Sequence, residues 1–204
     1  MYLRGMELFG RLVQKSAENL RKLAVDTTFS ESFASVVDRI VASYRGGGSL
    51  FVAGNGGSAA DAQHLVAELV SKLERDRDPI RAFALTVDTS ILTAIGNDYG
   101  YEYSFERQID GLMRSDDVFF AISTSGNSKN ILQALRRCRK KGVTSVLLTG
   151  RSGGVAVKEG LADLTLIVPG ETTAMIQEAH TVVYHLLCYQ IESQLVEQGL
   201  CRYR

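Results

Sequence analysis

The chain of 204 residues lacks several features that would assign it to a broad class of proteins. Its 23 basic and 23 acidic residues give a formal net charge of zero, and it has no polybasic run. Nucleic acids and anionic membranes attract proteins through clustered positive charge, so neither is expected as a partner. No apolar run reaches the ~18 residues from which a membrane-spanning helix is inferred, so no span is expected either.

Cysteine is also scarce. Cys138, Cys188 and Cys201 are odd in number, widely spaced and without a Cys-x-x-Cys pair. They indicate reduced thiols rather than a disulfide framework or a cysteine-rich zinc site. Charged and apolar residues alternate near the N-terminus, so no signal peptide is expected there. The sequence therefore predicts a soluble, cytoplasmic protein, and its length fits one domain with a sizeable core.

Five short apolar segments have the composition of buried strands. They are residues 49–54, 81–86, 117–123, 144–150 and 164–170. Helical patterns lie between most of them, at residues 58–74, 90–97 and 128–141. Such alternation predicts right-handed βαβ units, and hence a five-stranded parallel sheet covered by helices on both faces. We therefore expect a single α/β domain over residues 1–204, built as a three-layer sandwich.

Helices are also predicted at both ends of the chain. Residues 1–46 read as two helices, separated near the polar cluster Asp26-Thr27-Thr28. The last helix is expected from about Thr172 to Gln198, with apolar side chains over more than one stripe. These positions are Ile176, Val183, Leu186, Leu187, Ile191 and Leu195. A wide apolar arc on a terminal helix is typical of a subunit interface, so we expect an oligomer that also uses the N-terminal helices.

The segment after the first strand has the character of a ligand site. The loop Asn55-Gly56-Gly57-Ser58 leads directly into a helix, and its glycines permit positive φ and close approach of a ligand. Free N–H groups at a helix start attract anions, most often phosphate. Further along this helix His64 and Glu68 stand at i and i+4, and so share one face. A plain turn followed by a solvated helix face is the simpler alternative.

A second loop, Ser123-Thr124-Ser125-Gly126-Asn127-Ser128, follows the third strand in the same way. Its hydroxyls can donate to phosphate oxygens, although such residues also serve as ordinary helix caps. Two such loops on a sheet of this kind favour phosphate binding over capping alone. The Gly-Lys-Ser/Thr triplet of a P-loop is absent, and Asp88 lies about ten residues too late for a dinucleotide fingerprint, so a nucleotide is disfavoured.

Four motifs in order, GNGGSAADAQH, TAIGNDYGYE, STSGNS and TGRSGG, give the chain a specific resemblance. It resembles the sugar isomerase (SIS) domain family and, within it, the phosphoheptose isomerases, over nearly its whole length. The resemblance implies a flavodoxin-like SIS fold, a homotetramer, and conversion of sedoheptulose 7-phosphate to D-glycero-D-manno-heptose 7-phosphate. That aldose–ketose isomerisation begins the synthesis of nucleotide-activated heptose for surface glycans.

The resemblance also implies roles for individual residues. One zinc ion per subunit would be held by His64, Glu68, Gln177 and His185, with Glu68 and His185 as the acid–base pair. Glu68 and Gln177 would also contact the substrate. The other implied substrate-binding residues are Asn55, Gly56, Gly57, Ser58, Asn97, Asp98, Ser123, Thr124, Ser125 and Ser128. For Asn97 and Asp98 alone, a plain turn before Gly100 would be the simpler interpretation.

Helical geometry leaves part of this assignment open. Gln177 and His185 are eight residues apart, which is roughly 12 Å of rise and about 80° around an ideal helix. Both reach one ion only if the first turn is irregular or the site spans two subunits. Periodicity cannot choose His185 over His180, and the resemblance alone makes that choice.

Two departures from the family pattern and two competing functions also remain open. Lys72 stands where many members have arginine, and Ala174 lies in a segment that often carries charge. A non-catalytic SIS protein that binds a partner such as a replication initiator is one alternative function. An isomerase of another sugar phosphate is the other.

Overall fold

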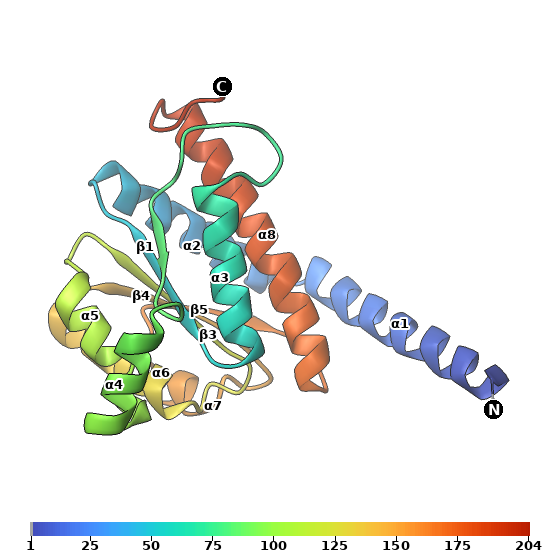
Figure 1. The fold of residues 1–204 in the computed structure, drawn as a ribbon. Helices are drawn as coiled ribbons and strands as arrows, with labels where there is room; N and C mark the ends of the chain where they lie inside the picture. The colour runs from blue at the N-terminus through green and yellow to red at the C-terminus, as the bar shows by residue number, and fades with distance from the viewer. Residues whose placement is uncertain (1) are drawn as a thin grey trace.

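The structure, a computed structural model, describes the backbone of residues 2–204 and the side chains from residue 7 onward. Its centre is a five-stranded, all-parallel sheet with the strand order β2-β1-β3-β4-β5 (Figure 1). The strands are β1 (Leu50–Gly54), β2 (Ala82–Ala84), β3 (Val118–Ser123), β4 (Thr144–Gly150) and β5 (Leu164–Val168). All five predicted strands are present, and the predicted α/β sandwich is confirmed.

Helices cover both faces of the sheet. The helices are α1 (Tyr2–Ala24), α2 (Thr27–Arg45), α3 (Gly57–Val70), α4 (Thr89–Asp98), α5 (Glu106–Leu112), α6 (Lys129–Lys141), α7 (Gly154–Lys158) and α8 (Thr173–Glu197), with a 3₁₀ turn, η1 (Tyr101–Tyr103). Side chains that alternate along β1, β3 and β4 enter two separate cores. One core lies under α2, α3 and α8, and the other under α5, α6 and α7.

Local sequence signals explain several helix boundaries. The Asp26 carboxylate accepts a hydrogen bond from the Phe29 N–H and starts α2, so the predicted break in the N-terminal helices is confirmed. Thr172 caps α8 in the same manner, through Met175 N–H. Gly142 ends α6 with a left-handed φ of 70°, the common role of glycine after a helix.

Other boundaries differ from the sequence prediction. α3 was expected to reach residue 74 but ends at Val70, because buried Arg77 donates to the carbonyls of Glu68 and Leu69. β2 spans only three of the six residues expected at 81–86. The short α5 and α7 were not predicted, since neither is long enough to show a clear period.

The two N-terminal helices differ in how they contact the rest of the chain. α2 packs on the sheet, whereas the first part of α1 extends away from the α/β body (Figure 1). The other end of α1 contacts the α/β body: the Asn19 amide donates a hydrogen bond to the carbonyl of Pro169, just after β5, at 2.9 Å. Within the described residues, no helix combines the length and the apolar character needed to cross a membrane.

Candidate active site

The two predicted ligand loops emerge side by side at the carboxyl end of the sheet. β1 and β3 are paired neighbours in the middle of the sheet, and the strand order reverses between them. Ligands of open α/β sheets bind at such a reversal, beyond the carboxyl ends of the strands. Gly56 has a φ of 55°, as the loop pattern predicted, and α3 begins without a side-chain cap. The N–H groups of Ser58 and Ala59 donate to the loop carbonyls of Asn55 and Gly56, which leaves the N–H of Gly57 without a partner among the described residues and open to a ligand.

A pair of side-chain amides joins the first loop to the start of α6, the helix that follows the second loop. The Asn55 amide donates to the Asn130 side-chain oxygen at 2.9 Å, and Asn130 donates back to the Asn55 oxygen at 2.8 Å. The Tyr101 hydroxyl also donates to this Asn55 oxygen, at 2.9 Å. Both the NH₂ group and the oxygen of the Asn55 side chain are therefore hydrogen-bonded to other side chains, which hold the first loop in place. Asn130 and Tyr101 were not predicted, since their pairing with Asn55 spans 75 and 46 residues of sequence.

The second loop, residues 123–128, is called the serine loop below; it carries hydroxyl groups between the end of β3 and the start of α6. The hydroxyls of Ser123 and Ser128 lie 3.3 Å apart, so both face the same small region. Ser128 occupies the cap position of α6 but makes no side-chain capping bond. Ser125 instead accepts from the Asn127 N–H within the loop. If the loop served only as a helix cap, the Ser128 hydroxyl would accept a hydrogen bond from the first turn of α6. It does not, and this supports the interpretation that the loop binds an anion.

The fourth motif, TGRSGG (residues 149–154), packs against the serine loop. A Cβ atom on Gly126 would lie only 1.8 Å from the carbonyl oxygen of Gly153, so the two backbones touch. The Asn127 side chain accepts from the Val155 N–H at 2.9 Å. Residues 151–154 thus fix the shape of the loop that carries the hydroxyls.

The predicted acid–base and metal residues meet between α3 and α8. The His64 Nε2 and Glu68 Oε1 atoms lie 3.1 Å apart, and the rings of His64 and His185 have centroids 5.0 Å apart. Each of His64, Glu68 and His185 offers a ligand atom, and these three atoms lie within 4.8 Å of one another. Two imidazoles and a carboxylate are ligands that zinc accepts, so these side chains fit the implied ion.

Gln177, the fourth implied ligand, lies on a continuous stretch of α8, beyond its first turn. Its amide faces the start of α3, because a Cβ atom on Gly57 would lie 2.3 Å from Gln177 Nε2. An irregular first turn is therefore not what brings Gln177 toward the site. The structure places this amide beside Gly57, where the first loop enters α3.

His180 lies apart from these residues. It is fully buried, and neither ring nitrogen has a hydrogen-bond partner among the described residues. Burial lowers its pKa to about 4, so the ring is neutral at physiological pH. Among the described residues, His185 and not His180 shares a cluster with His64 and Glu68, which favours His185 at this position.

A buried ion pair connects the two helices that carry the cluster. Arg77 Nε lies 2.6 Å from Glu192 Oε2 on α8, and both side chains are almost completely buried. The same guanidinium donates to the backbone carbonyl of Glu68 at 2.7 Å. This pair was not predicted, because no local pattern relates residues 115 positions apart.

Asn97 and Asp98 are the last two residues of α4, and the Asn97 amide donates to the Asp98 carboxylate at 2.7 Å. They therefore belong to a helix end and not to the plain turn considered from the sequence. The chain then passes into η1, where Tyr101 contacts Asn55, so this segment reaches the first loop through its tyrosine. Ser58 lies in the first turn of α3 and Thr124 in the serine loop.

Comparison with known proteins bears directly on this site. Residues 13–150 match the SIS domain family. A phosphoheptose isomerase of Sulfurimonas denitrificans is 46% identical over 188 residues, which cover 92% of this chain and 95% of that protein. The chain belongs to the phosphoheptose isomerase family.

Solved phosphoheptose isomerases have the same fold. The structure from Francisella tularensis superposes with a TM-score of 0.87 at 32% identity and covers 93% of this chain and 98% of the other. That from Neisseria gonorrhoeae gives 0.81 at 39% identity, over 91% and 99%. The predicted family, the predicted fold and the prediction of an isomerase are confirmed.

The two departures from the phosphoheptose isomerase pattern lie at exposed positions. Lys72 follows the end of α3, four residues after Glu68, and Ala174 lies in the first turn of α8. Since both are exposed, these changes alter surface chemistry beside the site and leave the core intact.

Proposed function

We propose that this protein interconverts sedoheptulose 7-phosphate and D-glycero-D-manno-heptose 7-phosphate, the first step toward nucleotide-activated heptose for a surface glycan. The observation that carries the proposal is the meeting of His64, Glu68 and His185 within 4.8 Å, between α3, which begins at the first loop, and α8. The competing non-catalytic function requires no such acid–base cluster. Nothing among the described contacts favours it.

The reaction moves one proton between neighbouring carbons of the substrate. Glu68 takes the proton from carbon 1 of the ketose, and the released electron pair forms the carbon 1–carbon 2 double bond of an enediol. His185 donates a proton to the carbonyl oxygen at carbon 2 as that bond forms. In the second half Glu68 returns its proton to carbon 2, and the hydroxyl at carbon 1 gives its proton to His185, so that a carbonyl forms at carbon 1 and both residues regain their starting states. Glu68 is suited to this because its side chain is only 18% exposed and Oε1 is oriented by His64.

Zinc is the proposed cofactor, one ion per subunit, held by His64, Glu68 and His185, with Gln177 of a neighbouring subunit as the fourth ligand, because the regular start of α8 leaves only a site that spans two subunits. When bound, such an ion polarises adjacent oxygens and stabilises negative charge on them. The chain's own residues bind and orient the sugar. The serine loop would hold the phosphate, and Gln177 with the first loop would contact hydroxyl groups near the reacting carbons.

Incubation of the purified protein with sedoheptulose 7-phosphate tests the proposal. Chromatographic separation should reveal a product of equal mass that accumulates to an equilibrium ratio. Shorter ketose phosphates serve as comparison substrates, since the second alternative is an isomerase for one of them. If the protein turned over a shorter sugar phosphate but not the heptulose, the proposed substrate would be wrong. The proposed reaction type, an aldose–ketose isomerisation, would stand.

Replacing Ser123, Ser125 and Ser128 with alanine should raise KM at least about tenfold, because hydrogen bonds to a charged group contribute about 1.5–3 kcal/mol each. The kcat value should change less, since these residues are remote from the transferred proton. Steady-state kinetics and thermal unfolding of the triple variant measure both effects. Ser115→Ala, an exposed serine between α5 and β3, is the control. An unchanged KM in the folded triple variant would mean that the loop is only a capping cluster.

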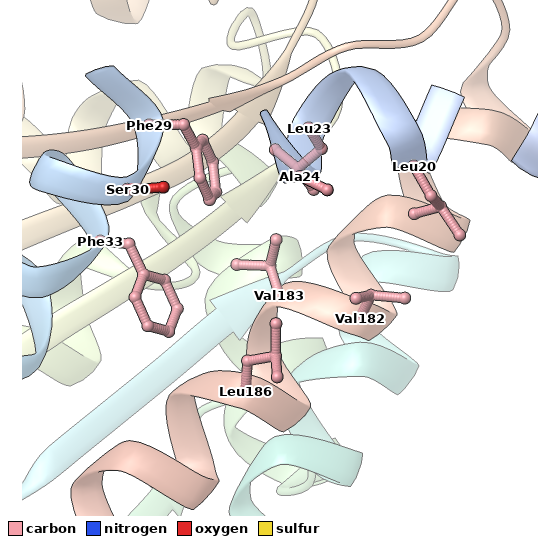
Figure 2. A pocket seen from close by; sticks show the side chains of 9 residues that line it. All are labelled: Leu20, Leu23, Ala24, Phe29, Ser30, Phe33, Val182, Val183 and Leu186. Atoms are coloured by element: carbon pink, nitrogen blue, oxygen red, sulfur yellow. The ribbon is translucent and has the colours of Figure 1, made fainter. Parts of the chain in front are cut away.

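We also propose that the protein is a cytoplasmic homotetramer that does not bind nucleic acid or membranes. The free and buried cysteines suit a reducing compartment. Assembly is supported by apolar side chains on α1 that its own chain does not cover, of which Phe9 is 72% and Leu12 53% exposed. At the opposite end of α1 an apolar cavity of about 440 Å³ opens between α1, α2 and α8, lined by side chains such as Phe29, Phe33 and Leu186 (Figure 2).

Leu12→Glu should convert the tetramer to smaller species at micromolar concentration, because a charge in an apolar interface is costly to bury. Light scattering after size-exclusion chromatography measures the mass. Arg11→Glu, an exposed neighbour on α1, is the control and should leave the assembly intact. A stable monomer of the unmodified protein would contradict the proposed assembly.

A further inference from the structure

Tyr184 is a buried tyrosine whose hydroxyl meets a candidate metal ligand. It is 1% exposed on α8, and its oxygen lies 2.8 Å from His64 Nδ1 on α3. The hydroxyl of a buried tyrosine usually has a hydrogen-bond partner, and here the partner is the imidazole of His64. No motif or spacing in the sequence connects residues 120 positions apart.

The two nitrogens of His64 face different neighbours. Nδ1 faces the Tyr184 hydroxyl, whereas Nε2 faces Glu68 Oε1 at 3.1 Å. Neutral imidazole has one N–H donor and one lone-pair acceptor, and the partner of one nitrogen decides the state of the other. An ion shared with Glu68 takes the lone pair of Nε2, which leaves the proton on Nδ1. The tyrosine oxygen is then placed to accept that proton's hydrogen bond.

We propose that Tyr184 is a positioning residue that holds the His64 ring and fixes its tautomer, with the Nε2 lone pair toward the metal position. The inference rests on the proposed zinc site and deepens it. Hydrogen bonds of this kind to ligating histidines orient the ring and raise its basicity.

The phenol ring makes separate contacts that a test must preserve. Its centroid lies 5.4 Å from that of His64 and 4.8 Å from that of His185, so the ring packs against both imidazoles. Tyr184→Phe retains these ring contacts and removes only the hydroxyl. Any change in metal binding then reports the hydrogen bond and not the packing.

Zinc affinity, measured by competition with a chromophoric chelator, is the decisive quantity. Tyr184→Phe should bind zinc about 10–100-fold more weakly than the unmodified protein, the usual effect of losing such a partner. Tyr44→Phe is the matched control, because it also removes one tyrosine hydroxyl. The Tyr44 hydroxyl donates to the backbone carbonyl of Arg81, away from His64, Glu68 and His185. The zinc affinity of Tyr44→Phe should not change. The visible spectrum of the cobalt-substituted protein should change in Tyr184→Phe alone.

The outcomes separate this inference from the function on which it rests. Zinc binding by Tyr184→Phe within twofold of the unmodified protein, with the same cobalt spectrum, would overturn the role of Tyr184 alone. An unmodified protein that isomerises its substrate without binding zinc would overturn both the metal site and this inference. Loss of thermal stability without loss of zinc affinity would show that the hydroxyl only stabilises the fold, and would also overturn it.

Discussion

Glu68→Gln should lower kcat by about 10²–10⁴-fold, the usual contribution of a general base. The amide keeps the size of the side chain and an oxygen that can still ligate, but it cannot accept the substrate proton. Substrate binding should persist, because the serine loop and the first loop are unchanged. Turnover of sedoheptulose 7-phosphate, calorimetric binding of the same sugar and zinc content measure the three quantities on one preparation.

Glu31→Gln is the matched control for this variant. Glu31 is an exposed glutamate on α2, so the same chemical change there should leave kcat, binding and metal content unaltered. If Glu68→Gln kept kcat within tenfold of the unmodified enzyme, another group would have to be the base.

His185→Asn should lose both turnover and zinc, because it removes a ligand and the proton donor together. His180→Asn on the same helix should retain zinc, since His180 lies in the core and not in the cluster with His64 and Glu68. It should unfold at a lower temperature, because it replaces a fully buried ring with a smaller polar side chain. Metal analysis, kcat and thermal unfolding of both variants test the contrast.

The opposite pattern would reverse the assignment on α8. A His180 variant that lost zinc and activity, beside a His185 variant that kept both, would place the ligand on the other face of the helix. The proposed isomerase activity could survive that result, because Glu68 would still supply the base.

The sequence predicts those features that depend on neighbouring residues. Buried parallel strands are nearly continuous apolar runs, so β3 and β4 were found almost to the residue. The break at Asp26 was found because a helix cap is a local signal. The two loops that we propose to bind the ligand were located for the same reason, since glycine and serine between a strand and a helix form a local pattern.

The features that were missed depend on contacts between distant segments. His180 and His185 are equivalent in pattern, and they differ only because the sheet covers one face of α8. The amide pair of Asn55 and Asn130 forms because β1 and β3 are neighbours, a fact of strand order. The end of α3 is set by Arg77, which lies outside the helix. In each case the tertiary arrangement decides what the local sequence leaves open.

The buried pair of Arg77 and Glu192 has a consequence for how this enzyme can diverge. Removing one partner of a buried ion pair costs about 3–5 kcal/mol, a large share of the roughly 5–15 kcal/mol that stabilises a typical domain. Replacement of both by apolar residues can be nearly neutral, so the accessible route requires two changes at once. We therefore expect lineages to retain the two residues together or to lose them together.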